Sequence, residues 1–68
     1  MLAEYYRIYF GKKVKVITND SRVIIGVFET IDRPGDNGYE EWSISITINS
    51  NCGEELLESE IKSIESAE

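Results

Sequence analysis

The stretch Trp42-Ser43-Ile44-Ser45-Ile46-Thr47-Ile48-Asn49 carries the clearest structural signal of the chain. Four apolar residues alternate with four small polar ones, which is the side-chain period of a β-strand. The alternation predicts a strand with one face in a hydrophobic core and the other face in water. We expect the core face to consist of Trp42, Ile44, Ile46 and Ile48.

Before this strand, residues 22–32 form a longer apolar stretch that also alternates. One face carries Ile24, Gly26 and Phe28, and the other carries Val23, Ile25 and Val27. Two apolar faces predict a strand that is buried on both sides, or that packs on a barrel on one side and on a helix on the other. Gly26, in the middle, permits the sharp bend with which a short sheet curls closed.

Three shorter strands and one helix complete the expected set of elements. Residues 12–17 alternate around Val14 and Val16, while residues 54–57 and 61–65 flank a tight connection. Turn-forming residues occupy positions 18–21, 33–38 and 49–53. At the N-terminus, apolar residues at helical spacing predict a helix that ends at Gly11, with a packing face of Leu2, Tyr5, Tyr6 and Tyr9.

These elements predict a mainly β fold in a single domain over residues 1–68. A short N-terminal α-helix over about 2–10 precedes a small five-stranded antiparallel barrel over about 12–66. A chain of 68 residues builds only a small core. We therefore expect packing against another copy or a partner to supply additional stability.

The charge of the chain is unevenly distributed along the sequence. The net charge is −6, with six basic and four acidic residues in 1–33 but one basic and nine acidic residues in 34–68. Nucleic-acid binding normally requires a basic surface that neutralises phosphates. Only the first half of the chain offers such a surface, and it is small.

Composition also argues against catalysis, metal binding and membrane insertion. Cys52 is the single cysteine and the chain has no histidine, which excludes an intrachain disulfide, a cysteine–histidine zinc site and a cysteine nucleophile activated by histidine. No apolar stretch approaches the ~20 residues of a membrane span, and the N-terminus lacks the features of a signal peptide. We expect a cytoplasmic protein that is not an enzyme and uses no cofactor.

Four short segments resemble the first motif of Sm and Sm-like (LSm) proteins: Val14-Lys15-Val16, Asp20-Ser21-Arg22, Gly26-Val27-Phe28 and Ile31-Asp32. That motif consists of a valine pair, a polar turn, a mid-strand glycine and an aspartate that ends the long second strand. Residues 60–64 resemble the end of the second motif, where the short fourth and fifth strands meet. With its leading helix the chain resembles a divergent bacterial- or phage-type member. Other five-stranded barrels of the SH3-like type share most of these structural residues.

The resemblance implies a site for uridine-rich RNA, but the chain departs from the family's pattern there. Family members use an aromatic or histidine residue and an asparagine in the loop after the aspartate, and an arginine–glycine pair between strands four and five. In this chain Pro34 stands at the stacking position, and residues 57–60 contain two glutamates in place of the pair. The candidate RNA-binding residues that remain are Asp32 and Asn37, with Lys13 and Lys15 from the basic half.

The expected function is a module that self-associates and acts as a protein-interaction or assembly scaffold. In Sm-like proteins strands four and five pair across subunits and generate a ring, which the resemblance implies here. The expected homo-oligomer is a ring or a dimer, with interface residues Leu56, Leu57, Ile61 and Ile64. The alternative is an RNA-binding Sm-like protein with an atypical site for uridine-rich or single-stranded RNA.

Overall fold

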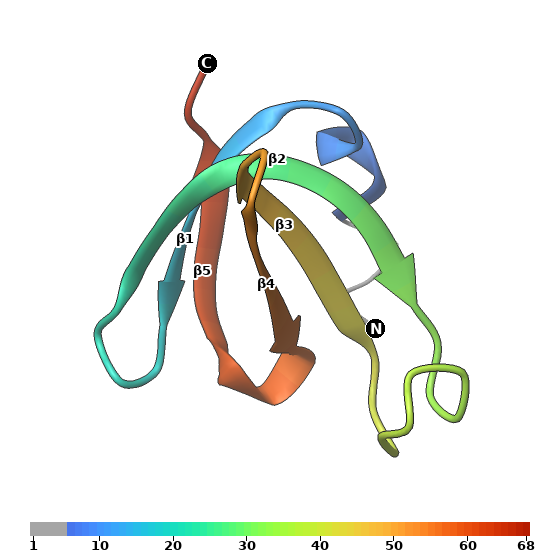
Figure 1. The fold of residues 1–68 in the computed structure, drawn as a ribbon. Helices are drawn as coiled ribbons and strands as arrows, with labels where there is room; N and C mark the ends of the chain where they lie inside the picture. Colours follow the sequence, from blue (N-terminus) through green and yellow to red (C-terminus); the bar gives the residue numbers. More distant parts are fainter. Residues whose placement is uncertain (1–5) are drawn as a thin grey trace.

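A computed structural model describes residues 6–68 of the chain. Five strands form one sheet (Figure 1): β1 (Lys13–Thr18), β2 (Val23–Asp32), β3 (Ser43–Asn49), β4 (Cys52–Leu57) and β5 (Ile61–Ser66). Their order across the sheet is β4-β3-β2-β1-β5, and every neighbouring pair is antiparallel. The predicted mainly β fold with five antiparallel strands is therefore confirmed.

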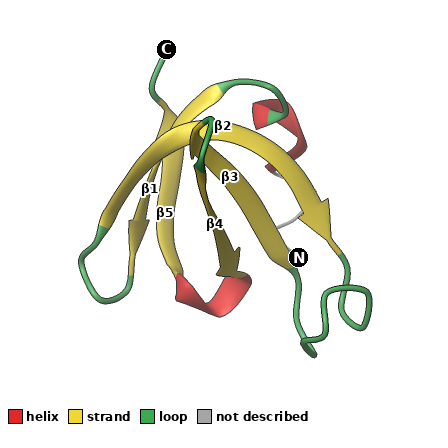
Figure 2. Cartoon of the chain, viewed as in Figure 1, coloured by secondary structure: helices red, strands yellow, loops and turns green. Residues whose placement is uncertain are grey.

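The sheet is open, because its two ends do not pair with each other. Within residues 6–68, β4 is hydrogen-bonded only to β3, and β5 only to β1. The short 3₁₀ helix η2 (Glu58–Glu60) connects these two edge strands, as Figure 2 shows. The last strands of the chain thus lie at opposite ends of the hydrogen-bonded order, although three residues separate them in sequence.

The predicted N-terminal α-helix over residues 2–10 is not confirmed. Of the described residues, Arg7–Tyr9 form a single 3₁₀ turn, η1, and residues 1–5, including Leu2 and Tyr5 of the expected packing face, lie outside the described part. A turn this short is held by its contacts and not by helix propensity. Tyr6 is buried. The ring centroids of Tyr9 and Phe10 lie 6.5 and 5.5 Å from the ring centroid of Phe28.

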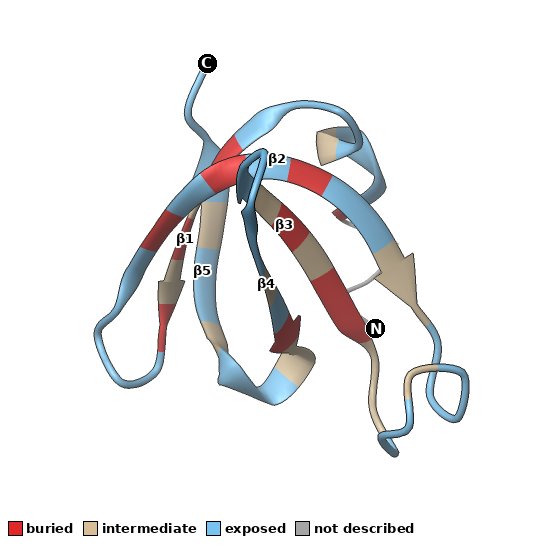
Figure 3. Cartoon of the chain, viewed as in Figure 1, coloured by how far each residue is buried: buried red, intermediate tan, exposed pale blue. Residues whose placement is uncertain are grey.

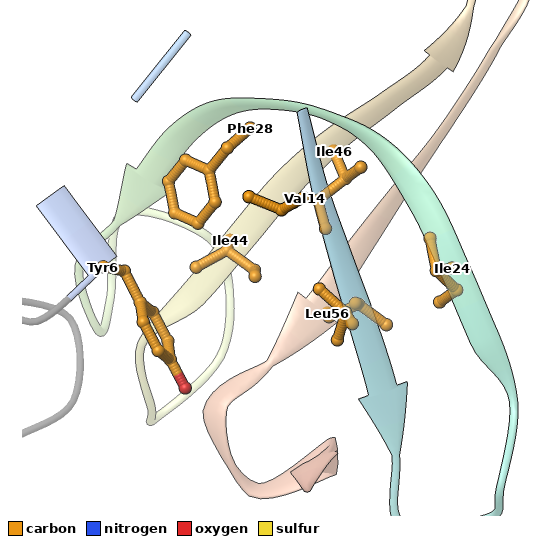
Figure 4. Close-up of a cluster of buried hydrophobic side chains, with 8 residues drawn as sticks. Tyr6, Val14, Ile24, Phe28, Ile44, Ile46 and Leu56 are labelled. Atoms are coloured by element: carbon orange, nitrogen blue, oxygen red, sulfur yellow. The ribbon is translucent and has the colours of Figure 1, made fainter. Parts of the chain in front are cut away.

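The core lies inside the curve of the sheet (Figure 4) and is built from alternate residues of the strands. Val14 and Val16 of β1 and Phe28 of β2 are fully buried, because β1 has a strand on both sides and β2 arches over it. The whole cluster consists of Tyr6, Val14, Val16, Ile24, Phe28, Ile44, Ile46 and Leu56. Alternation along the predicted strands therefore located most of the core correctly.

Gly26 marks a very close approach between β2 and β3. A Cβ atom at this position would lie 2.5 Å from the backbone oxygen of Thr47 and 2.8 Å from Cγ2 of Ile46. No real side chain is accommodated at such distances, so glycine is required for the two strands to pack this tightly.

The two ends of β3 differ from the sequence expectation. Ile48, expected in the core, is 41% exposed, and Ser43, expected in water, is buried. Ser43 is buried because the β2–β3 loop and the Glu55 side chain bind its hydroxyl group. In addition, β4 begins at Cys52, two residues earlier than expected, so this exposed cysteine lies in a strand and not in the predicted turn.

The second apolar face of β2 is also exposed, contrary to the expectation of burial on both sides. Val23, Ile25 and Val27 are 55%, 45% and 36% exposed, and β2 alternates between buried and exposed residues in Figure 3. None of the described elements packs on this outer face, since η1 lies against Phe28 on the core side.

The register of β3 is tested by two matched substitutions, Ile46→Asp and Ile48→Asp. We expect Ile46→Asp to lower the free energy of unfolding by about 3 kcal/mol or more, because it buries an unpaired carboxylate in a 1% exposed position. Ile48→Asp, two residues along the same strand, should cost less than about 1 kcal/mol. Urea denaturation measures both, and equal losses would contradict the observed register.

The contact at Gly26 is tested by Gly26→Ala, with Gly53→Ala as the control. We expect Gly26→Ala to destabilise the fold by about 1–3 kcal/mol, since the added methyl group overlaps backbone that cannot easily move. A methyl group added at Gly53 would lie 3.2 Å from its nearest backbone oxygen, that of Ile46, so a much smaller loss is expected. Thermal denaturation of the two variants, measured side by side, compares their losses of stability.

Candidate functional site

The β2–β3 loop, residues 33–42, lies against η2 and forms the most highly connected polar region of the described chain. The carboxylate of Glu41 accepts hydrogen bonds from the backbone N–H and the hydroxyl group of Ser59, at 2.7 and 3.0 Å. The backbone N–H of Glu58 donates to the carbonyl oxygen of Trp42 at 2.8 Å. We call this region, residues 33–43 with η2, the loop–η2 site. It is where the resemblance places ligand-binding residues.

Asn37 holds the loop together from within. Its side-chain N–H₂ group donates to the carbonyl oxygen of Glu41 at 3.0 Å and to the hydroxyl oxygen of Ser43 at 2.8 Å. Its side-chain oxygen accepts from the backbone N–H of Tyr39 at 2.8 Å. Both donor hydrogens and the acceptor oxygen are thus engaged inside the protein, and the amide cannot read a base without giving up these bonds.

The buried hydroxyl group of Ser43 links the loop to the sheet. It accepts from Asn37 and donates to Oε2 of Glu55, on β4, at 2.9 Å. A buried polar group is stable only when its hydrogen bonds are satisfied, and this chain of three side chains satisfies Ser43 fully. The loop, β3 and β4 are therefore joined by one polar network.

The electrostatic character of the loop–η2 site is acidic. Arg33 is the only basic residue between positions 33 and 60, and its guanidinium group lies 3.4 Å from the carboxylate of Asp36 at the exposed surface. Oε2 of Glu58 is enclosed and has no hydrogen-bond partner among residues 6–68. Burial, together with the Glu58 carboxylate, raises the pKa of the Tyr6 hydroxyl group above its ordinary value of 10.0. Such surroundings repel phosphate groups.

The structure does not bring the four candidate RNA-binding residues together. Lys13 and Lys15 lie on β1, opposite Val27 and Ile25 of β2, and Nζ of Lys15 is 3.9 Å from the carboxylate of Glu65. Asp32 ends β2 five residues beyond Val27, about 16 Å further along the strand. Asn37 lies beyond it, in the loop. The four residues therefore form two separate pairs: Lys13 and Lys15 on β1, and Asp32 and Asn37 at the end of β2 and in the loop that follows.

The proposed interface residues also divide into two groups. The Leu56 side chain is only 1% exposed and belongs to the core of its own chain, so it cannot contact a neighbouring subunit. Leu57, Ile61 and Ile64 are half-buried, and the last two pack against the core from β5. The Leu56 side chain faces inward because alternate residues of an edge strand point to the core, and an interface that includes Leu57, Ile61 and Ile64 stays a prediction.

A shallow hollow of about 270 Å³ lies at the other side of η2, lined by Asn19, Asp20, Ser59 and Glu60. The Asn19 side chain donates to the carbonyl oxygen of Ser59 at 2.6 Å, which ties the β1–β2 turn to η2. Hydrogen bonds from the Thr18 hydroxyl group and from Arg22 lower the pKa of Asp20 below 3.8. Each of these polar groups has a structural partner, so the hollow shows no built ligand site.

Within residues 6–68, no group of three or more acidic, cysteine or histidine side chains is placed to hold a metal ion. The same part of the chain contains no helix of sufficient length and apolar character to cross a membrane. No pattern in the sequence marks Glu41, Ser43, Glu55 and Ser59 as partners of the loop. Ser43 is indistinguishable from Ser45 in the alternating pattern, and only the folded arrangement separates their roles.

Comparison with known proteins gave no match: no family model matches the chain, and neither the curated proteins nor the solved structures contain a significant match.

We expect weak or no binding of short uridine-rich RNA at physiological salt, because the asparagine is engaged and the site is acidic. Fluorescence titration at about 0.15 M salt should give no Kd below about 1 μM. Any residual binding should weaken as salt is added, and Lys13→Glu or Lys15→Glu should reduce it further. Tight binding that Asn37→Ala abolishes would overturn this expectation and assign the loop–η2 site to RNA.

Proposed function

We propose that the chain is a non-enzymatic Sm-like small-barrel module that self-associates in the cytoplasm and serves as a scaffold for protein assembly. The observation that supports this most directly is the pair of open sheet edges at β4 and β5. An edge strand presents unpaired backbone N–H and C=O groups, and pairing them with another strand is favourable. In a domain with so small a core, such pairing adds stability that one chain alone lacks.

The backbone of β5 is suitably oriented for this pairing. The N–H of Ala67 donates to the carbonyl oxygen of Lys13 at 2.9 Å, so this pair of residues is hydrogen-bonded between β5 and β1. Hydrogen-bonded pairs alternate along an antiparallel ladder. The backbone groups of Ser66 and Ile64, which oppose Val14 and Val16, therefore point to the free edge. A neighbouring strand can bind there without disturbing β1.

Charge favours pairing of unlike edges. β4 carries Glu54 and Glu55, so two copies of β4 side by side would place like charges together. β5 carries Lys62, the one basic residue after position 33, which reduces repulsion when β5 meets β4 of another copy. Such a head-to-tail contact generates a ring if its rotation closes. We propose Leu57, Ile61 and Ile64 as residues beneath this contact, with Leu56 contributing only its backbone.

The Sm-like barrel assignment rests on the sequence resemblance together with three supporting features. β2 arches strongly, β3 packs closely on it at Gly26, and η2 makes a tight connection between β4 and β5. The β2–β3 loop and η2 also lie side by side, joined by Glu41 and Ser59, as two loops of a shared binding face would. The internal hydrogen bonds of Asn37 and the acidic surroundings favour the scaffold over RNA binding.

Self-association is tested by Ser66→Pro, with Ser66→Ala as the control. Proline removes the N–H group that points to the free edge while leaving the bonds to β1, and it is tolerated at a sheet edge. We expect wild type and Ser66→Ala to give masses above the 7.8 kDa of one chain by light scattering at tens of micromolar, and Ser66→Pro to shift toward the monomer.

Association should strengthen between low and physiological salt, because salt screens the net charge of −6 that each copy carries. A matched pair of variants, Lys62→Glu and Lys12→Glu, distinguishes the effect of charge at the sheet edge from the effect of net charge on association. Both change the net charge equally, but only Lys62 lies on an edge strand, so Lys62→Glu should weaken association more. A strict monomer at every salt concentration would rule out the proposed function.

A further inference from the structure

Asn37 is followed by Gly38, which is exposed and has a φ of +81°. In an asparagine–glycine pair the backbone nitrogen of the second residue reaches the side-chain amide carbon with little hindrance, because glycine has no Cβ. We infer that Asn37 is a site of spontaneous deamidation that the hydrogen bonds of the loop–η2 site hold in the amide form. This inference is independent of the proposed self-association.

The chemistry requires only the chain and water. The backbone nitrogen of Gly38 loses its proton to solvent and attacks Cγ of Asn37, forming a C–N bond. The bond between Cγ and Nδ2 breaks, and the leaving nitrogen takes up a proton and departs as ammonia. One water molecule then opens the resulting cyclic imide at either of its two C–N bonds. The products are aspartate, or isoaspartate in which the main chain runs through Cγ.

The folded loop opposes the attack on Cγ and the departure of the leaving nitrogen. The leaving nitrogen, Nδ2, is held by the carbonyl oxygen of Glu41 and the hydroxyl oxygen of Ser43, and Oδ1 is held by the N–H of Tyr39. Ser43 in turn is buried and oriented by Glu55. While these bonds persist, the amide group is fixed at both Nδ2 and Oδ1 and is not free to rearrange into the cyclic imide. The reaction therefore proceeds from a locally opened loop, at a rate set by how often the loop opens.

The modified loop cannot close again in the same way. A carboxylate at position 37 has acceptor oxygens only and has no hydrogen to donate to Glu41 or Ser43. It would also add a negative charge to a site that already contains Glu41 and Glu55. Deamidation thus removes both hydrogen bonds that the side chain at position 37 donates, and it places a carboxylate against the carbonyl oxygen of Glu41.

The first experiment compares the folded chain with a synthetic peptide of residues 33–42 at mildly alkaline pH. Mass spectrometry of proteolytic fragments measures the rate at Asn37 in each. We expect the rate in the folded chain to be lower by about ten-fold or more, since two hydrogen bonds to Nδ2 must break first. Equal rates in chain and peptide would show that the network gives no protection, and would overturn the inference.

The second experiment uses Ser43→Ala, with Ser45→Ala as the matched control on the same strand. Loss of the Ser43 hydroxyl group removes one of the two acceptors of Nδ2, so the rate at Asn37 should rise several-fold, while Ser45→Ala leaves it unchanged. Asn49 serves as an internal reference, because general unfolding would raise its rate as well. An increase at Asn37 alone supports the inference, and no increase in Ser43→Ala contradicts it. If Ser43→Ala unfolds, the inference is tested by the deamidation rates of the wild-type chain and the peptide alone.

Discussion

The close packing of β2 on β3 at Gly26 is the constraint on which the rest of the structure depends. The backbone oxygen of Thr47 and Cγ2 of Ile46 occupy the space that a Cβ atom at position 26 would need. Only glycine allows the two strands to approach this closely. This contact lets β2 arch, so that Phe28 and Ile24 point to the same small core as Val14 and Val16 of β1. The arch also brings the end of β4 near the start of β5, where three residues of η2 suffice to connect them. Curvature, core and open edges thus have one common origin.

The polar network around Ser43 shows how the same residue type can carry a different role from the one that motif resemblance implies. An asparagine in this loop implies base recognition in the resembling family, but here it satisfies a buried hydroxyl group and a carbonyl oxygen of its own chain. The network joins the loop to β4 through Glu55 and, through Glu41, the loop to η2. Because an unsatisfied buried polar group is costly, the asparagine stabilises the closed arrangement of the loop. A residue so fully engaged is poorly available for binding.

Sequence patterns located the strands well because alternation is a local property. Trp42 to Asn49 and residues 22–32 each carry the period of two that burial on one face requires, and the structure places strands there. What the patterns did not reveal depends on distant partners. Ser43 is buried because of Asn37 and Glu55, Ile48 is exposed because β3 extends beyond the core, and the aromatic spacing near the N-terminus yields only the turn η1 among described residues. The outer face of β2 looked buried because its valines and isoleucine satisfy the same pattern as a core strand.

The acidity of β4 and η2 has a physical consequence for how this chain can assemble. Charged side chains protect a sheet edge from indiscriminate pairing, and Glu54 is further held by Arg22 of its own chain at 3.6 Å. Such an edge disfavours a second copy of itself but remains open to β5, whose Lys62 offsets part of the repulsion. Head-to-tail contacts either close or grow without limit. Since each copy added to the proposed assembly brings a net charge of −6, repulsion would grow with the number of copies, which favours a small closed assembly over a long open one.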